Sequence, residues 1–198
     1  LADCDNVTVV QGDAMKLDLH ALLAAHFPPG MPVAVCANLP YYITSPLIMR
    51  LLESRLPLTS VTVMVQKEAA ERLCAAPGTR ECGAVSLAVQ YYAEPQPLFA
   101  VSRGSFMPAP HVDSAVIRLA VRPQPPVTVA DEKRLFAVIR AAFGQRRKTL
   151  VNAVSAAGYT SAEIRAALDD MGLSPTVRAE ELTLAQFAAL TDRLTAGQ

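Results

Sequence analysis

Two hydrophobic patterns alternate along the first part of the chain. Short apolar, β-branched or alternating runs are typical of strands, and longer stretches with a 3.6-residue apolar period are typical of helices. Strand patterns occur at 7–10, 33–37, 61–65 and 111–121. Helix patterns occur at 17–27, 45–54 and 67–75, while 85–92 fits either a helix or a strand. Strands separated by helices predict an α/β fold with a largely parallel sheet.

A proline-rich segment, Arg122–Pro126, separates this part from a second one of different character. Because prolines stiffen the chain, the segment is expected to be a semi-rigid linker. Helix patterns prevail beyond it, at 132–143, 146–157, 161–171 and 184–194. The expected N-caps are Asp131, Ser161 and Thr183. The sequence therefore predicts an α/β domain over residues 1–122 and a small all-helical domain over 127–198.

Composition and charge narrow the class of protein. Of the 198 residues, 52% are hydrophobic and 18% are charged, which is typical of a globular protein with a sizeable core. No apolar run long enough to cross a bilayer is free of charges and of Pro or Gly breaks, so no transmembrane helix is expected. The first residues lack the basic and apolar regions of a signal peptide. Since the net charge is zero, only local basic clusters can argue for a nucleic-acid partner.

The cysteines are too scattered for a metal site. Cys4, Cys36, Cys74 and Cys82 include no C-x-x-C pair, and no histidine stands at ligand spacing from them. We therefore expect free thiols in a reducing, cytoplasmic compartment, and no bound metal ion.

The segment Asn38–Tyr42 (Asn-Leu-Pro-Tyr-Tyr) carries the most specific chemistry. It directly follows the apolar run 33–37, and ligands of open α/β sheets bind beyond the carboxyl ends of the strands. The asparagine side chain and a backbone carbonyl, such as that of Leu39, can accept the two N–H groups of an exocyclic amine. Pro40 stiffens the loop, and Tyr41 offers a face on which a base can stack. By itself, the segment also fits an ordinary turn after a strand.

Several segments together resemble the ribosomal RNA adenine N6,N6-dimethyltransferases, a family that includes the erythromycin-resistance methyltransferases. The segments that resemble the family are Gln11–Ala14, Asn38–Pro46, Val65–Leu73, Ser105–Ser114, Phe143–Leu150 and Arg178–Leu182. The last two favour the branch that modifies small-subunit ribosomal RNA. The resemblance implies an enzyme that uses S-adenosylmethionine to dimethylate N6 of adenines, two adjacent ones, in that RNA during ribosome assembly.

The resemblance also assigns roles to single residues. Phe106 would be a second stacking face for a target base that has left its stack. The catalytic set is thus Asn38, Leu39, Pro40, Tyr41 and Phe106. Asp13 would accept the adenine amino group of S-adenosylmethionine, and Asn38 would also contact this cofactor. From the sequence pattern alone, Phe106 also fits a core side chain and Asp13 an Asx-turn.

A basic cluster, Gln145-Arg146-Arg147-Lys148, is the strongest in the chain. It is expected at the start of a helix in the second domain, where these four residues would bind RNA phosphates. Binding would then weaken steeply with salt. A solvated helix face is the alternative interpretation.

One family feature is not found. Members carry a Gly-x-Gly-x-Gly loop after the first strand and an acidic residue at the end of the second strand, and none of the 9 glycines here is arranged in this way. We therefore expect an incomplete Rossmann-like methyltransferase sheet that lacks the family's first two strands. We also expect weak or absent S-adenosylmethionine binding. An unpaired edge at 33–37 would favour self-association.

Three other functions stay open at this point. A DNA adenine methyltransferase more often carries Asp or Asn followed by Pro-Pro-Tyr, and the helical tail argues against it. An erythromycin-resistance-type enzyme would methylate large-subunit ribosomal RNA. A non-catalytic RNA-binding or ribosome-assembly module would bind RNA in a salt-sensitive manner without transferring methyl groups.

Overall fold

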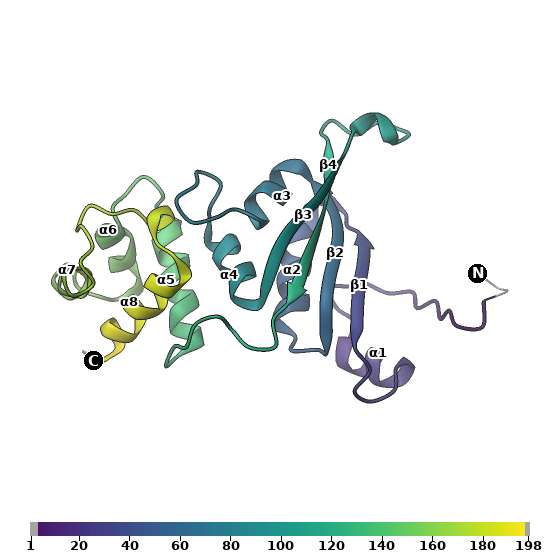
Figure 1. Cartoon of the computed structure of the whole chain (residues 1–198), viewed down its shortest axis with the longest axis horizontal. Coiled ribbons are helices and arrows are strands. Elements are labelled where there is room, and N and C mark those ends of the chain that lie inside the picture. The colour runs from purple at the N-terminus through teal and green to yellow at the C-terminus, as the bar shows by residue number, and fades with distance from the viewer. Residues whose placement is uncertain (1–3, 197–198) are drawn as a thin grey trace.

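The computed structural model describes residues 4–196. A sheet with its helices forms one end of an elongated molecule, and a group of helices forms the other (Figure 1). The strands are β1 (Val33–Asn38), β2 (Leu58–Gln66), β3 (Ala93–Val101) and β4 (Ser114–Val121). The helices are α1 (Leu19–His26), α2 (Thr44–Glu53), α3 (Lys67–Leu73), α4 (Ala84–Tyr92), α5 (Glu132–Gly144), α6 (Leu150–Val154), α7 (Ser161–Asp170) and α8 (Leu184–Ala196). Short 3-10 turns are η1 (Tyr41–Ile43), η2 (Arg103–Ser105), η3 (Ser155–Ala157) and η4 (Ala179–Glu181).

The strands of the described part pair in the order β1-β2-β4-β3. β1 and β2 are parallel, whereas β4 runs antiparallel to both β2 and β3. The α/β class is confirmed. β1, β2 and β3 share one direction, as expected of a largely parallel sheet, and β4 is the exception, because it runs antiparallel to both of its neighbours. β3 and β4 are joined directly by the loop 102–113, and strands joined without a crossover helix run antiparallel.

Two strand assignments differ from the sequence pattern. The pattern does not predict β3, because Pro95, Pro97 and a run of exposed side chains interrupt it. β3 lies at the edge of the sheet, where prolines are tolerated because the outer N–H groups have no strand to bond. Residues 7–10 fit a strand pattern but are exposed and form no strand. Within residues 4–196 no strand pairs with them, so the extended run has no ladder to stabilise it.

Apolar faces of α2 and α4 supply much of the core against the sheet. The predicted helix 45–54 is confirmed by α2, which buries Leu47, Ile48, Leu51 and Leu52. The ambiguous segment 85–92 is helical in α4, where Leu87 and Val89 are fully buried. A strand would have exposed alternate side chains of this segment, whereas the helix buries most of them.

The helical pattern after the linker is confirmed, with a correction at the basic cluster. Asp131 caps α5 by accepting hydrogen bonds from the backbone N–H groups of Lys133 (2.8 Å) and Arg134 (3.1 Å). The predicted helix from 146 begins only at Leu150. Residues 145–148 form a turn in which the Lys148 N–H donates to the Gln145 carbonyl (2.8 Å).

A second correction concerns the cap of α7. Thr160, rather than Ser161, caps this helix: its hydroxyl accepts from the Glu163 N–H (3.2 Å), and the Glu163 carboxylate accepts from the Thr160 N–H (2.7 Å). This reciprocal pair is a capping box. Before α8, the Thr183 hydroxyl accepts from the Gln186 N–H (3.2 Å), as expected of an N-cap. The fully buried Phe187 then lies in the core of the helical group.

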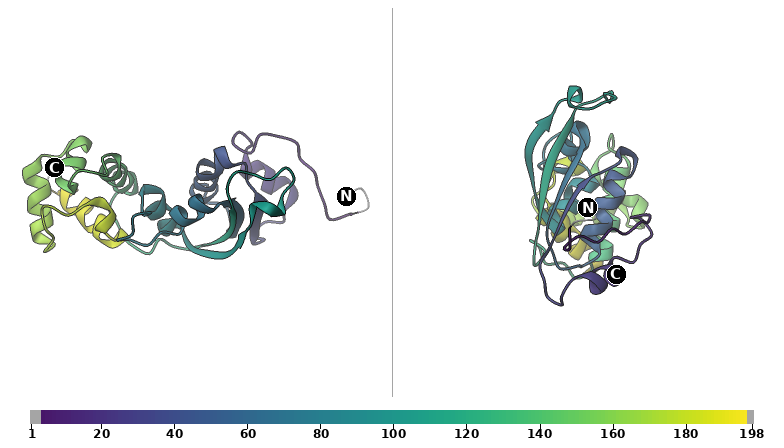
Figure 2. Two further views of the ribbon diagram at one scale, coloured as in Figure 1. Left: turned by 90° about the horizontal axis from the view of Figure 1, so that it is seen from above. Right: turned by 90° about the vertical axis from the view of Figure 1, so that its right-hand side faces the viewer.

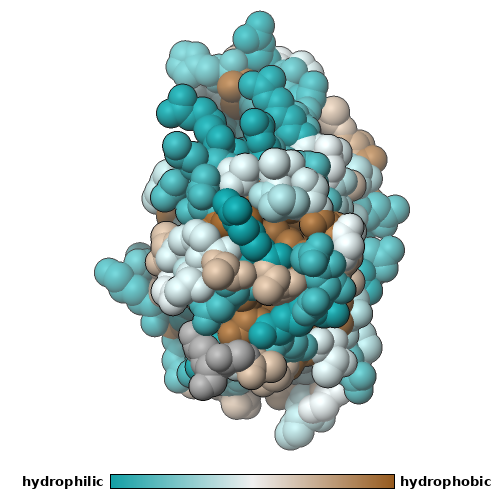
Figure 3. Space-filling model, turned by 90° about the vertical axis from the view of Figure 1, so that its left-hand side faces the viewer, coloured by the Kyte–Doolittle hydropathy of each residue, from teal (hydrophilic) through white to brown (hydrophobic). Residues whose placement is uncertain are grey.

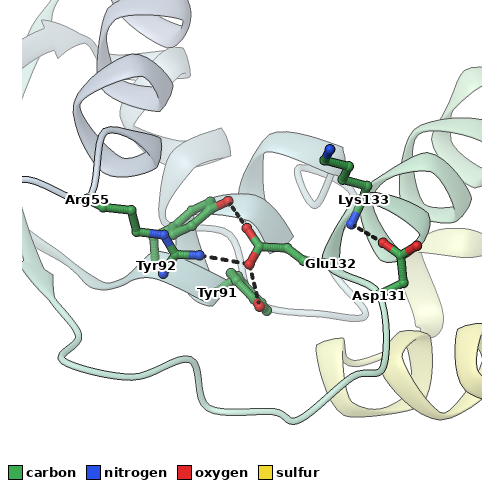
Figure 4. Close-up of polar contacts among 6 residues, drawn as sticks. All are labelled: Arg55, Tyr91, Tyr92, Asp131, Glu132 and Lys133. Carbon is green, nitrogen blue, oxygen red and sulfur yellow. Dashed lines mark hydrogen bonds and ion pairs between the residues drawn. The ribbon is translucent and has the colours of Figure 1, made fainter.

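One polar cluster joins the helical group to the sheet and its helices (Figure 4). The Glu132 carboxylate, in the first turn of α5, accepts hydrogen bonds from Tyr92 (2.7 Å), Tyr91 (3.2 Å) and Arg55 (2.7 Å). The Arg55 guanidinium also lies 5.3 Å from the centre of the Tyr92 ring. Burial, followed by the contact with Glu132, raises the pKa of both tyrosines. The cluster therefore connects the α2–β2 segment, the end of α4 and the start of α5.

The molecule is elongated, and the end formed by the helical group has a mainly polar outer surface. The helical group lies at the end of the molecule opposite α1 (Figure 2). Its outer end face is largely hydrophilic, with hydrophobic atoms lying in hollows between polar side chains (Figure 3). In the described residues, no helix is both long and apolar enough to span a membrane.

Candidate functional site

Hydrogen bonds to β2 and to the start of α2 anchor the loop after β1. Asn38 is the last residue of β1, and the next N–H group, that of Leu39, donates to the Met64 carbonyl on β2 (3.3 Å). The Leu39 side chain is buried. The Pro40 carbonyl accepts from the Ile43 N–H (3.2 Å) and from the hydroxyl of the buried Thr44 (3.3 Å). The loop is therefore anchored at both ends.

Two hydrogen-bond acceptors of this loop are unoccupied. Among the described residues, neither the exposed Asn38 side chain nor the Leu39 carbonyl has a hydrogen-bond partner. The neighbouring Pro40 carbonyl, in contrast, accepts two hydrogen bonds within the loop. The loop thus presents an amide oxygen and a carbonyl oxygen to a ligand, while the Leu39 N–H and the Pro40 carbonyl are satisfied.

All five predicted catalytic residues line one cavity of about 340 Å³. The β1 loop contributes Asn38, Leu39, Pro40 and Tyr41, and the β3–β4 loop contributes Phe106, Pro108 and Pro110. The latter loop projects beyond the end of the sheet (Figure 1). Segments that are far apart in the sequence therefore place two aromatic rings and two free acceptors around one space.

Ser114, which the sequence interpretation missed, fixes the Tyr41 ring. The two hydroxyl groups lie 3.0 Å apart, and Ser114 is fully buried as the first residue of β4. A buried serine hydroxyl needs a partner, and here it finds the tyrosine that lines the cavity. Ser114 ends the segment that resembles the family, so that segment contained a signal for it.

Asp113 anchors the loop that carries Phe106. Its carboxylate accepts from the Arg103 N–H (2.9 Å), and its carbonyl accepts from the Lys67 N–H at the start of α3 (3.0 Å). The Arg103 side chain also donates to the His111 carbonyl (3.4 Å). The two ends of the loop are therefore joined to each other and to α3. The sequence interpretation also missed this role.

Asp13 lies apart from the cavity that Asn38 lines. One carboxylate oxygen accepts from the Met15 N–H (2.9 Å), as in an Asx-turn, and the other lies 3.7 Å from the Lys16 ammonium. The carboxylate is half exposed. Arg50 of α2 holds the following turn by donating to the carbonyls of Ala14 and Leu17. The structure thus shows the Asx-turn, and the second carboxylate oxygen keeps room for a further donor.

All four residues of the basic cluster are exposed, and the Arg146 side chain is also hydrogen-bonded to the protein. The Arg146 guanidinium donates to the carbonyls of Arg80 and Cys82 (3.0 Å to the latter) in the loop between α3 and α4. A cavity of about 590 Å³ lies at this junction, and its lining includes Arg80, Arg146 and Arg178 together with Glu180 and Glu181.

The cysteines form no disulfide, and no metal-binding cluster is found among the described residues. Burial raises the pKa of the Cys82 thiol, which the hydrogen bond to Ser86 and the nearby Arg146 charge partly oppose. All four cysteines are free. The residues that the structure describes contain no group of three or more His, Cys, Asp or Glu side chains able to hold a metal ion.

A family model and curated relatives match this chain in sequence. A family model described as ribosomal RNA adenine dimethylase matches residues 2–196. Two curated relatives named ribosomal RNA small subunit methyltransferase A, from Geobacillus thermodenitrificans and Streptococcus pneumoniae, are 48% and 47% identical over 198 residues. Each alignment covers 98% of this chain and 68% of the relative.

Solved structures agree in fold. A dimethyladenosine transferase from Plasmodium falciparum matches with a TM-score of 0.75 and 24% identity, over 96% of this chain and 72% of the other. The 23S rRNA methyltransferase ErmE matches with a TM-score of 0.61 and 25% identity, over 89% and 76%. The fold is therefore the Rossmann-like one of ribosomal RNA methyltransferases. With nearly the whole chain matched by the family model and relatives at almost half identity, the chain belongs to the ribosomal RNA adenine dimethylase family.

Proposed function

We propose that this chain methylates N6 of adenine in small-subunit ribosomal RNA, with S-adenosylmethionine as the methyl donor. The resemblance implies that two adjacent adenines are each dimethylated during ribosome assembly. One observation carries the proposal: the free acceptors of Asn38 and Leu39 face the same cavity as the Tyr41 and Phe106 rings. The relatives named small subunit methyltransferase A support the choice of RNA.

The chemistry follows from the nucleophile. The N6 lone pair of adenine is delocalised into the ring, so the amine must be held and reshaped before it reacts. The Asn38 amide oxygen and the Leu39 carbonyl each accept one N–H of the amine, which fixes the nitrogen and favours a tetrahedral geometry. The lone pair is then directed at the incoming methyl group. This is catalysis by positioning and fixed dipoles.

The aromatic rings supply the binding energy for the displaced base. An adenine must leave its stack to enter the cavity, and stacking on an aromatic face contributes ~1–3 kcal/mol per base. Tyr41 and Phe106 stand on the two loops that form the cavity. The methyl donor would supply the carbon of the new N–C bond and keep the electrons of its broken C–S bond, so the amine that these residues hold would become cationic. The surplus proton then leaves the cationic amine for water, so no strong base is required.

Two groups of this chain fit the cofactor, and, since the Gly-x-Gly-x-Gly loop is not found, we propose that they form an incomplete site that binds S-adenosylmethionine weakly. The Asp13 side chain is half exposed and can accept from the adenine amino group, and Asn38 keeps its amide free at the cavity. When bound, S-adenosylmethionine supplies an electrophilic methyl group. We assign the binding of its adenine end to Asp13 and a contact close to the reacting centre to Asn38.

The basic cluster is proposed to bind RNA phosphates. Arg147 and Lys148 are exposed beside the arginine-lined cavity, with Gln145 as a neutral donor. Arg146 has a double role, because its guanidinium is already bonded to two carbonyls of the α3–α4 loop. It contributes positive charge while it fixes the helical group.

Two alternatives differ from this proposal in the substrate or in the chemistry. A large-subunit enzyme of the ErmE kind matches at 25% identity, against 48% for a small-subunit relative. A non-catalytic RNA-binding module would use the basic cluster but not the Asn38 cavity. The two free acceptors lie beside two aromatic rings in one cavity, which favours the enzyme, because methyl transfer needs the base and its amino group to be held together.

Three further proposals accompany the function. We divide the chain into a partial methyltransferase domain, 1–122, and a helical domain, 127–198. The free cysteines support a cytoplasmic location. Self-association through the outer edge of β1 stays a prediction, supported by the position of β1 at the end of the strand order.

The direct test offers three substrates to the full chain together with isotopically labelled S-adenosylmethionine. Small-subunit ribosomal RNA, large-subunit ribosomal RNA and adenine-containing DNA are compared, and the products are digested to nucleosides. We expect label in N6-methylated adenosine from the small-subunit RNA. Label in the large-subunit RNA would support the alternative enzyme, and RNA binding without label would support the non-catalytic module.

A further inference from the structure

A further cavity lies outside the candidate catalytic site. It is an open groove of about 780 Å³ between α3 and the edge strand β3, and its surface is mainly apolar. Neither the Asn38 loop nor the arginine cluster explains it. An apolar groove of this size on a protein surface commonly marks a binding site.

One face of α3 forms the first wall. It consists of Lys67, Ala70, Glu71, Cys74 and Ala75, which follow the i, i+3, i+4, i+7, i+8 spacing of a single helix face, the last two just after the helix. At a rise of about 1.5 Å per residue, this wall is roughly 12 Å long. Because even a fully stacked strand rises by about 3.4 Å per nucleotide, that length fits at most about three nucleotides.

The second wall is the irregular middle of β3. The register of β3 against β4 shifts between Pro97 and Phe99, so Pro97, Leu98 and Phe99 all line the groove. Bulges redirect side chains in this way. Leu98 is 42% exposed and Phe99 is 61% exposed. An aromatic ring therefore stands open beside an apolar floor.

The groove connects the two sites that the proposed function uses. At one end it is lined by Lys67 and by Ala115, which directly follows the Ser114 that holds Tyr41. At the other end it is lined by Thr79, which also lines the arginine cavity with Arg146. A strand that runs from the adenine cavity towards the basic cluster would pass along this groove.

We propose that the groove binds unstacked bases of the RNA strand next to the target adenine. This proposal rests on the proposed function. Phe99 provides a stacking face, and base–aromatic stacking tolerates every base. The Glu71 and Glu81 carboxylates on the wall accept from exocyclic amino groups, while Lys67 lies where it can pair with a phosphate. The groove thus keeps the flanking nucleotides out of the stem while the adenine is in its cavity.

The walls favour RNA over a protein segment. A peptide that docks on an edge strand bonds to its outer N–H and C=O groups. Pro95 and Pro97 remove two donors from β3, so this edge is poor for strand addition. Stacking on Phe99 needs no such ladder.

The test uses a fluorescent base in the RNA and needs no methyl donor. Two small-subunit RNA fragments carry 2-aminopurine, one at the nucleotide next to the target adenine and one in the distant stem. Binding by the full chain should change the fluorescence of the first RNA and leave the second unaltered. Phe99→Ala should abolish this change and weaken RNA binding about tenfold, which corresponds to about 1.4 kcal/mol.

The control variants separate stacking from folding. Phe27→Ala removes a similarly exposed aromatic ring at the end of α1, far from the groove, and should leave both readouts at wild-type values. Phe99→Trp should retain binding, and Leu98→Ala tests the same wall if Phe99→Ala does not fold. Wild-type affinity and fluorescence change in Phe99→Ala and Leu98→Ala would overturn the proposal and favour a protein occupant.

The fluorescence test of the groove does not depend on methyl transfer. If the wild-type chain methylates adenine but Phe99→Ala behaves like wild type, the groove proposal alone is wrong. If the wild-type chain shows the fluorescence change but transfers no methyl group to any RNA, the proposed function is wrong.

Discussion

The Tyr41 and Ser114 hydroxyl groups lie 3.0 Å apart, and this contact joins the loop after β1 to the first residue of β4. It spans 73 positions of the sequence and sets the direction of an aromatic ring at the cavity. The base-stacking face is therefore positioned by the sheet itself rather than by its own loop.

Removing this contact should loosen the ring. A hydrogen bond of this kind contributes ~0.5–1.5 kcal/mol. Tyr41→Phe should therefore lower kcat/KM for methyl transfer by roughly 2- to 10-fold, and Ser114→Ala should do the same. The double variant should show little further loss, because both changes remove one interaction. Additive losses would show that the two residues act separately, and Tyr41→Ala, which removes the whole ring, should be worse than either.

Substitutions in the basic cluster should have two different effects. Arg147→Ala and Lys148→Ala should weaken RNA binding without lowering stability, and each should reduce the salt slope of log K by about 0.7–0.9 per lost phosphate contact. Arg146→Ala should also lower the free energy of unfolding, because the carbonyls of Arg80 and Cys82 lose their donor. Filter binding across a salt series and denaturant unfolding measure the two effects. Equal stability losses in all three variants would contradict this division.

The Glu132 cluster should stabilise the junction of the two groups of elements. Glu132→Gln removes the charge that Arg55, Tyr91 and Tyr92 share. Because the site is partly exposed, we expect a loss of about 1–2 kcal/mol in the free energy of unfolding. Glu94→Gln, an exposed carboxylate on β3, is the matched control and should change little. Indistinguishable unfolding curves for the two variants would show that the cluster contributes nothing.

The free energy of unfolding should decrease at alkaline pH because the Tyr92 phenol is held in its protonated form by the fold. Burial, and then the hydrogen bond and charge of Glu132, raise the pKa of this phenol well above its ordinary value. As pH rises above about 10, the unfolded chain loses the phenol proton first, so the free energy of unfolding decreases. Tyr92→Phe should make this decrease shallower in denaturant titrations at increasing pH. A slope as steep as that of wild type would assign the alkaline loss to other groups.

Local patterns predicted the helices well. The 3.6-residue period identified α2, and the residue types at Asp131 and Thr183 identified two caps. These features depend on neighbours within one helical turn, which the sequence contains. The β3 strand and the start of α6 depend on tertiary partners, so the pattern did not predict them. For β3, pairing with β4 outweighs two prolines.

The residues that line the candidate site could be predicted from the sequence. The residues that hold them in place could not. The motif from Asn38 to Tyr41 and the segment with Phe106 could be recognised, and the structure brings them around one cavity. Ser114 and Asp113 hold these residues through contacts between distant segments, which no local pattern contains. The groove beside Phe99 also needs the bulge in β3, and that bulge exists only once the strands are paired.

Asn38 has the central role in the proposed reaction. Its free amide oxygen is proposed to hold the adenine amine, so Asn38→Ala should lose this acceptor without disturbing the fold, since the side chain is exposed and has no partner within residues 4–196. The decisive measurement is single-turnover methyl transfer to small-subunit ribosomal RNA, made beside RNA affinity, for wild type and Asn38→Ala. We predict a loss of at least about 100-fold in rate, as for other positioned acceptors and donors of transition-state charge, with unchanged RNA affinity. Transfer at the wild-type rate in Asn38→Ala would contradict the account.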